Sequence, residues 1–309
     1  MGMHLRIGTR GSRLALAQSE WVKEQIQLRH PDLRVSLVKI KTKGDKILDS
    51  PLSKIGGKGL FVKEIEAALL RGEVDLAVHS MKDVPADLPE GLDISIFPER
   101  EDPRDVLVSP NCRTLSDLPE GASVGTGSLR RAAQILHLRP DLRIVSIRGN
   151  VDTRLKKLRE QNLGALVLAA AGLRRLGLKE NIMEYLDPEK ILPAIGQGAL
   201  GLELRREDTR VREQIEFLNH RETELCVRTE RAFLKTLGGG CQVPIAGYAR
   251  YENGKIELSG MVAELDGSGI IRDRLDGNGS DPEKIGITLA KRLLASGAER
   301  ILAELIPDE

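Results

Sequence analysis

Short apolar runs alternate with amphipathic stretches along the first two-thirds of the chain. The short runs predict strands, and the apolar positions at helical spacing predict the helices between them. Such a βαβ succession is typical of a mostly parallel sheet. In the first part of the chain we expect strands at 5–9, 35–41, 75–79 and 94–97, and helices at 14–28 and 60–71.

The alternation restarts after the polar segment 99–104, which predicts a second α/β unit. Its expected strands are 106–108, 123–125, 144–147 and 165–168, and its expected helices are 129–138 and 151–161. A glycine-rich segment, 193–198, followed by an apolar strand, 200–204, indicates a return crossover. The chain therefore predicts two periplasmic-binding-protein-like α/β domains joined by a double-crossover hinge.

The pattern changes from residue 221 onwards. A helix at 221–237 precedes three alternating strands at 245–250, 255–263 and 269–275, with hairpin turns at Asn253-Gly254 and Asp266-Gly267. A C-terminal helix is expected at 282–305. This part predicts a small α+β domain with a three-stranded antiparallel sheet. We expect the domains to comprise residues 1–98 with 199–218, residues 104–192, and residues 221–309.

The composition, 40% hydrophobic and 30% charged over 309 residues, is typical of a globular protein in water. No apolar run approaches the roughly 18 residues of a membrane helix, so we expect no membrane partner. The N-terminus enters the first strand without an apolar export segment, which favours the cytoplasm. Aromatic residues, at 3%, are too few for single-strand nucleic-acid binding.

The cysteine and histidine patterns point away from a metal site. Three cysteines without a CxxC pair argue against both a disulfide framework and a zinc site. The five histidines are scattered along the chain, so we expect no metal.

Arginines recur in tight groups although the net charge is only +1. This distribution indicates anionic groups bound at defined points. One group lies in residues 125–131 (GTGSLRR), between a strand and a helix, where free N–H groups, Thr126, Ser128, Arg130 and Arg131 make an anion site. The segment lacks the Lys-Ser/Thr ending of a P-loop, so nucleotide binding is poorly supported.

Residues 9–13 (TRGSR) repeat this arrangement at the first strand–helix junction, with Arg10, Ser12 and Arg13. Either segment alone would more often be a capped helix with solvated arginines. Two such segments at equivalent points of successive α/β units favour a ligand cleft between the units.

Asp83, in residues 79–85 (HSMKDVP), also follows a predicted strand. It could cap a turn before Pro85. In a cleft filled with cations, however, a carboxylate would be the group that transfers protons and stabilises positive charge. Residues 56–61 (GGKGLF) form a basic, glycine-rich segment that is interpreted either as a lid or as a solvated loop.

Cys241 follows three consecutive glycines in residues 237–244 (LGGGCQVP). The missing side chains leave room for a large group beside the thiol. The alternative is a glycine-rich helix end followed by a small buried cysteine.

These motifs, together with residues 148–151 (RGNV), resemble the porphobilinogen deaminase (hydroxymethylbilane synthase) family in the same order along essentially the whole chain. The resemblance implies a transferase and a monomer in tetrapyrrole (haem, porphyrin) biosynthesis. It would carry a dipyrromethane cofactor joined to Cys241 by a thioether. Four porphobilinogen units would be added with loss of ammonia, and linear hydroxymethylbilane would be released by hydrolysis.

The resemblance also implies residue roles, with Asp83 as the catalytic group. The cofactor would be held by Lys82, Asp83, Thr126, Ser128, Arg130, Arg131 and Arg154. The substrate would be held by Arg10, Ser12, Arg13, Lys58, Phe61, Ser80, Arg148, Arg154, Arg175 and Gln197. Each pyrrole carries an acetate and a propionate, which suits the planar arginine fork.

Two other readings remain open. One is a two-lobed protein that binds an anionic solute without catalysis, against which stand the absent export segment and the third domain. The other is a thiol enzyme with Cys241 as a transient nucleophile, which needs a histidine base that is not near in sequence.

Overall fold

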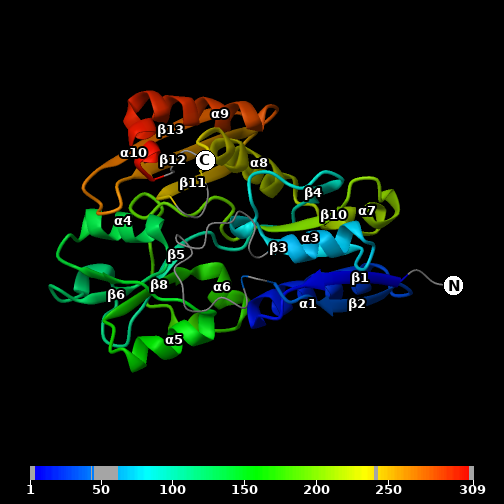
Figure 1. The fold of residues 1–309 in the computed structure, drawn as a ribbon, viewed down its shortest axis with the longest axis horizontal. Coiled ribbons are helices and arrows are strands. Elements are labelled where there is room, and N and C mark those ends of the chain that lie inside the picture. The colour runs from blue at the N-terminus through cyan, green and yellow to red at the C-terminus, as the bar shows by residue number, and fades with distance from the viewer. Residues whose placement is uncertain (1–3, 43, 45–61, 240–242, 306–309) are drawn as a thin grey trace.

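The structure, a computed structural model, describes residues 4–42, 44, 62–239 and 243–305. Two α/β units lie beside one another along the long axis, and a C-terminal unit lies against both (Figure 1). None of the described helices has the length and apolar character needed to cross a bilayer.

A five-stranded mixed sheet forms the first α/β domain, in the order β2-β1-β3-β10-β4. Its strands are β1 (His4–Thr9), β2 (Arg34–Lys39), β3 (Leu76–Ser80), β4 (Leu92–Ile96) and β10 (Leu200–Arg205). Its helices are α1 (Arg13–Arg29), α3 (Lys63–Leu70) and α7 (Thr209–Ile215). The alternate residues Leu5 and Ile7 of β1 are fully buried in the apolar cluster beneath α1.

A second five-stranded sheet forms the second α/β domain, in the order β7-β6-β8-β5-β9. Its strands are β5 (Asp105–Val108), β6 (Ser123–Gly125), β7 (Arg143–Val145), β8 (Ala165–Ala169) and β9 (Glu184–Tyr185). Its helices are α4 (Leu129–Leu138), α5 (Val151–Glu160) and α6 (Ala170–Arg175). Single-turn 3₁₀ segments are η1 (Met81–Asp83), η2 (Leu115–Asp117), η3 (Lys179–Asn181) and η4 (Glu216–Leu218).

The two five-stranded sheets have the same topology, and each contains one strand that crosses over from the other domain. In the first sheet β1 lies between β2 and β3, in the second sheet β6 lies between β7 and β8, and each of these pairs is parallel. The fourth position is taken by an antiparallel strand that comes directly from the other unit: β10 in the first sheet and β5 in the second. The double crossover expected from the sequence is therefore confirmed.

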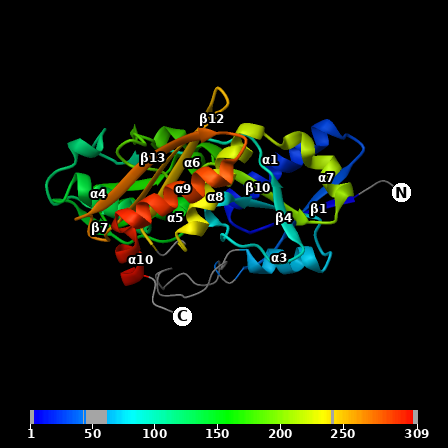
Figure 2. The same ribbon diagram turned by 90° about the horizontal axis from the view of Figure 1, so that it is seen from above.

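The C-terminal domain is a three-stranded antiparallel sheet covered by helices. Its strands are β11 (Ile245–Glu252), β12 (Lys255–Ala263) and β13 (Ile270–Asn278), and its helices are α8 (Arg221–Thr236), α9 (Pro282–Leu293) and α10 (Glu299–Leu305). Helices α8 and α9 lie side by side (Figure 2). The predicted C-terminal helix is interrupted by a π-helical turn, η5 (Leu294–Ala298), in which Gly297 takes a φ of 105° that breaks the helical course.

The expected fold class is confirmed by these three sheets. Elements missing from the sequence prediction are short: α6, α7 and the two-residue strand β9. Their few residues give no apolar period long enough to recognise.

Candidate active site between the two α/β domains

The N-terminus of α4 builds one wall of the site. Ser128 caps the helix by accepting a hydrogen bond from the backbone N–H of Arg131 at 3.4 Å. The hydroxyl of Thr126 in turn accepts from the N–H of Ser128 at 3.2 Å, so both hydroxyls are fixed at the helix start. The cap places Arg130 and Arg131 in the first helical turn, where the unpaired N–H groups also favour an anion.

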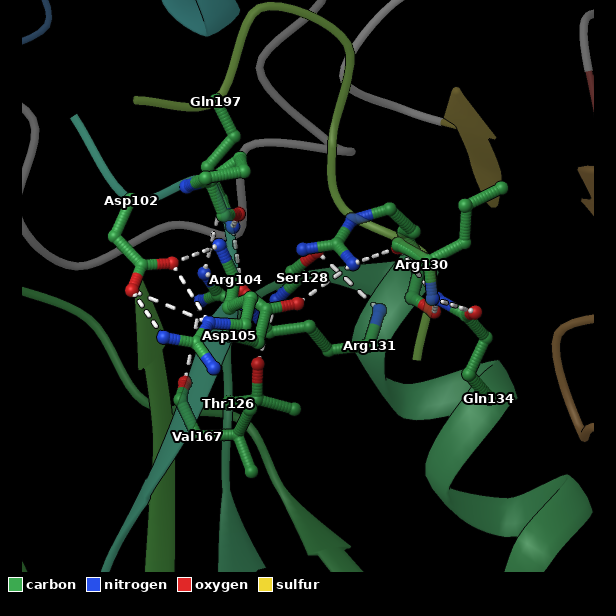
Figure 3. Close-up of polar contacts among 12 residues, drawn as sticks. Asp102, Arg104, Asp105, Thr126, Ser128, Arg130, Arg131, Gln134, Val167 and Gln197 are labelled. Carbon is green, nitrogen blue, oxygen red and sulfur yellow. Dashed lines mark hydrogen bonds and ion pairs between the residues drawn. The ribbon is translucent and has the colours of Figure 1, made fainter. Parts of the chain in front are cut away.

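Both arginines are buried around the carboxylate of Asp105, the first residue of β5 (Figure 3). Arg130 Nη1 lies 2.7 Å from Asp105 Oδ2, and Arg131 Nη2 lies 2.8 Å from Asp105 Oδ1. Burial alone would raise the pKa of Asp105, but the two guanidinium groups outweigh it and hold that pKa well below its usual range. The carboxylate is therefore ionised and paired with both cations.

Gln197 connects this cluster to the hinge. Its Nε2 donates to the carbonyl of Pro103 in the first crossover at 2.7 Å and to Asp105 Oδ1 at 2.8 Å. Its Oε1 accepts from Arg131 Nη2 at 3.3 Å. Gln197 itself lies in the second crossover, so its side chain joins both crossovers to the arginine pair.

The opposite wall comes from the end of β3 and the turn η1 in the first domain. Ser80 accepts a hydrogen bond from Gln18 Nε2 of α1 at 2.9 Å. Arg10, Ser80 and Asp83 line one small pocket together with His79 and Gln18. The side chain of Asp83 is exposed, so its carboxylate is accessible to a ligand.

Charges on the two walls act on each other. Burial lowers the pKa of Lys82 to about 8, an effect that Asp83 opposes and Arg131 reinforces. Burial likewise lowers the pKa of Arg154, on α5, to about 10, with Arg131 adding to the shift and Asp83 opposing it. The turn of the first domain therefore faces the cations of the second, as the sequence predicts for a cleft.

The remaining predicted arginines also have partners within the protein. Arg13 forms an ion pair with Asp152 at 2.8 Å, which joins α1 to α5. Arg175 Nη2 donates to the carbonyl of Gly198 at 2.7 Å, and burial lowers the pKa of Arg175 to about 10. The backbone carbonyl of Arg148 accepts a hydrogen bond from Lys157 Nζ. The positive charge of the Arg148 guanidinium contributes to the lowered pKa of Arg154.

The second crossover passes very close to the first. Gly198 has a φ of +87°, and a Cβ there would collide with the carbonyl oxygen of Glu101. The backbone N–H of Glu101 donates to the carbonyl of Gly198 at 3.3 Å. These contacts fix the two connections as one hinge.

Three predicted site residues, Lys58, Phe61 and Cys241, lie outside the described residues. Ser12 is the N-cap of α1 and accepts from the N–H of Ala15 at 3.3 Å. Among the described residues, no group of His, Cys, Asp and Glu side chains has the arrangement of a metal site.

Comparison with known proteins found two family models that match this chain. The family model "porphobilinogen deaminase, dipyromethane cofactor binding domain" covers residues 5–213, and "porphobilinogen deaminase, C-terminal domain" covers residues 224–295. The chain belongs to the porphobilinogen deaminase family.

Full-length relatives agree with the family models. The porphobilinogen deaminase of Syntrophotalea carbinolica is 58% identical over 301 residues, which cover 97% of this chain and 96% of that protein. The porphobilinogen deaminase of Geobacter sulfurreducens is 56% identical over 305 residues, covering 99% and 96%. Among solved structures, the periplasmic aliphatic sulphonate binding protein of Escherichia coli aligns with 76% of this chain and 71% of its own, with a TM-score of 0.41 and 16% identity.

Sequence reasoning missed one residue of the candidate site in this member of the porphobilinogen deaminase family, Asp105. It stands in a charged run just before the short apolar strand 106–108, where it reads as part of a solvated linker. A charged residue at the first position of a buried strand was the available signal. Its partners lie 25 or more positions further along the chain, and only the fold brings them together.

Proposed function

We propose that this chain acts as a hydroxymethylbilane synthase, a transferase that joins four porphobilinogen molecules head to tail with loss of ammonia and releases linear hydroxymethylbilane by hydrolysis. The observation that carries the proposal is the match of both porphobilinogen deaminase models across residues 5–213 and 224–295. The cation-rich cleft between the α/β domains supports it, because each porphobilinogen carries two carboxylates.

The described residues fit the dipyrromethane cofactor for which the family model is named. Within the part of the chain that the structure describes, the buried Nε of Arg130 has no hydrogen-bond partner, so a carboxylate could satisfy it. We propose that the cofactor is held by Lys82, Asp83, Thr126, Ser128, Arg130, Arg131 and Arg154. When bound, the dipyrromethane supplies the free pyrrole end to which the first porphobilinogen is joined.

The states of the other two cysteines support Cys241 as the attachment residue. Cys226 is 6% exposed, and burial raises the pKa of its thiol to about 12, which suppresses the reactive thiolate. Cys112 lines a separate cavity beside Pro119 and Asn162 in the second domain, at the far ends of strands β6 and β8 from the arginine cluster.

Asp83 is proposed as the principal catalytic group. Loss of ammonia from porphobilinogen leaves a cation delocalised over the pyrrole ring, and a carboxylate beside it stabilises that charge. The exposed Asp83 carboxylate can also accept a hydrogen bond from a pyrrole N–H. Lys82 and Arg154 bring positive charge to the same place, which suits the substrate's carboxylates.

The substrate and the growing chain are proposed to bind along the rest of the cleft. The residues proposed for this are Arg10, Ser12, Arg13, Lys58, Phe61, Ser80, Arg148, Arg154, Arg175 and Gln197. Arginine suits this work because its fork donates two parallel hydrogen bonds to one carboxylate. Arg13 and Arg175 would have to divide their N–H donors between the substrate and their present acceptors, Asp152 and the carbonyl of Gly198.

We further propose domain limits of 1–98 with 199–218, 104–192, and 221–309, a monomeric state without a metal, and a cytoplasmic location. Supporting these limits, residues 99–104 and 193–198 form the paired crossovers. Size-exclusion chromatography with light scattering tests the monomer, and cell fractionation tests the location.

The experiment that tests the function is turnover of porphobilinogen by the purified chain. We expect one ammonia released per porphobilinogen consumed and a linear tetrapyrrole detected by mass spectrometry. An Asp141→Asn variant serves as the control, since the carboxylate that it replaces pairs with Arg139 and lies outside the pocket of Arg10, Ser80 and Asp83. A protein that binds porphobilinogen but never consumes it would instead be the two-lobed binding protein.

A further inference from the structure

The carboxylate of Asp105 stands between two guanidinium groups that the proposed function assigns to the cofactor. Asp105 is completely buried, and Arg130 and Arg131 are 4% and 5% exposed. Oδ1 accepts from Arg131 Nε at 3.0 Å and from Arg131 Nη2 at 2.8 Å, while Oδ2 lies 2.7 Å from Arg130 Nη1. One carboxylate therefore neutralises and orients both cations (Figure 3).

The donors of the two arginines are used very differently. Arg131 directs Nε and Nη2 to Asp105, Nη1 to the carbonyl of Val167 at 3.2 Å, and Nη2 also to Gln197. A guanidinium has five N–H donors, so few remain on Arg131. Arg130 Nη1 donates to the carbonyl of Leu192 at 2.6 Å and lies at ion-pair distance from Asp105 Oδ2, while its buried Nε has no hydrogen-bond partner among the described residues.

Asp105 also connects the pair to the hinge. It directly follows the first crossover, and its Oδ1 accepts from Gln197 of the second crossover at 2.8 Å. Gln197 Nε2 donates to Pro103 as well, at 2.7 Å. The carboxylate thus fixes the two guanidinium groups relative to both crossovers.

We propose that Asp105 is a positioning residue for cofactor assembly: it holds Arg131 in place and presents the open side of Arg130, so that the anion site is formed before the cofactor carboxylates arrive. The proposal rests on the proposed function, because it takes Arg130 and Arg131 as cofactor ligands. A cofactor carboxylate would meet a guanidinium that is already oriented, and no ordering of Arg130 is then needed on binding.

The first domain offers a matched control in Asp75. This aspartate is also buried, at 6% exposed, and also lies between two arginines, Arg6 at 2.8 Å and Arg205 at 3.4 Å. It lies near the Gly72 turn, to whose carbonyl Arg6 donates, and lines no part of the cleft. Loss of its charge removes the same kind of interaction without touching the cofactor site.

The experiment uses the full chain produced in cells that make no porphobilinogen, so that it is purified without cofactor. Wild type, Asp105→Asn, Asp105→Glu and Asp75→Asn are incubated with porphobilinogen, and the gain of two pyrrole units is followed by intact mass. Loading rates are divided by the folded fraction from circular dichroism, measured well below each unfolding midpoint. Asp105→Glu keeps the charge but moves it by one methylene, so it reports on position even if Asp105→Asn does not fold.

We expect both Asp105 variants to load at least about tenfold more slowly than wild type per folded molecule, the equivalent of one lost charged hydrogen bond. Molecules that do become loaded should keep the wild-type KM for porphobilinogen. Asp75→Asn should lose stability yet load at the wild-type rate.

Wild-type loading by Asp105→Glu, and by Asp105→Asn if it folds, would overturn the inference, as would equally slow loading by Asp75→Asn. A wild-type chain that never gains two pyrrole units would instead refute the proposed function itself.

Discussion

The carboxylate of Glu230, on α8 of the C-terminal domain, lies 2.6 Å from Nη1 of Arg100 in the first crossover. The same carboxylate accepts from the backbone N–H of Gly196 in the second crossover at 2.6 Å and from that of Ala249 in β11 at 2.8 Å. Arg100 also donates to the carbonyl of Gln197 at 2.8 Å. One fully buried carboxylate therefore joins the domain that contains Cys241 to both connections of the hinge.

Glu230→Gln should strongly destabilise the protein. The substitution leaves the guanidinium of Arg100 buried without its counter-charge, a change that typically costs roughly 3–5 kcal/mol. Urea denaturation followed by circular dichroism measures the loss. Asp87→Asn is the control, because Asp87 and Lys235 form an exposed ion pair between the first domain and the same helix, α8. Equal, small effects of the two substitutions would contradict a structural role for the buried pair.

Asp83→Asn should lower kcat by about 10²–10³ with the fold intact. The amide keeps the shape of the side chain but removes the negative charge opposite the cation that forms when ammonia leaves. Because Asp83 is exposed, its replacement should barely change the unfolding midpoint. Steady-state kinetics with porphobilinogen measures the loss. A variant within a few-fold of wild type would exclude Asp83 as the principal catalytic group.

The arginines should divide into two groups by what their loss does. Neutral substitutions of Arg130 or Arg131 should yield chain largely without cofactor. Substitutions of Arg10 or Arg148 should keep the cofactor but stall elongation, which intact mass would show as enzyme with fewer added pyrroles. Each lost charged hydrogen bond should cost roughly 1.5–3 kcal/mol, or about one to two powers of ten in affinity.

Lysine should not replace these arginines, since it lacks the planar fork. The exposed Arg29, and Arg300 in its surface ion pairs, serve as controls and should be nearly silent. Mild and equal effects in both groups would mean that the clusters are only solvated faces.

A buried carboxylate in the first domain should make stability depend on pH. Burial raises the pKa of Glu66 to about 7, with the charge of Glu203 adding to the shift and His79 and Lys63 opposing it. The folded state then holds a proton that the unfolded state releases above its lower pKa. Stability should therefore fall as the pH rises from about 4.5 through 7, the interval between the two pKa values.

Glu66→Gln should remove this dependence. The variant should gain a few degrees in unfolding midpoint at pH 8 and nothing at pH 4.5, as measured by thermal denaturation. Glu24→Gln is the control, because Glu24 is an exposed carboxylate on α1 that does not contribute to the pKa shift of Glu66. A gain that is the same at both pH values would contradict ionisation as its cause.

The sequence was sufficient for the elements with a clear apolar period. The strands of both five-stranded sheets except β9, helices α1, α4, α5 and α8, and the hairpin of β11 and β12 follow from spacing and turn residues, and so does the crossover at 193–198. The helix break at Gly297 could not be predicted from the sequence, because a single glycine near the end of a long apolar period does not show whether the helix bends there.

The site was partly predictable for the same reason. Anion-binding loops at strand–helix junctions carry local signals, and the structure brings Lys82, Asp83, Arg131 and Arg154 within electrostatic reach of one another. Buried carboxylates such as Asp105 and Glu230 carry no local signal. Their roles depend on partners 26 and 130 positions away, which only the folded chain brings close.

The intact mass of the purified protein tests the central claim most directly. The wild-type mass should exceed the sequence mass by two pyrrole units, and Cys241→Ser should show the bare sequence mass and no turnover of porphobilinogen. Cys112→Ser and Cys226→Ser should keep the added mass. A fully active wild-type chain with the bare mass would contradict the account.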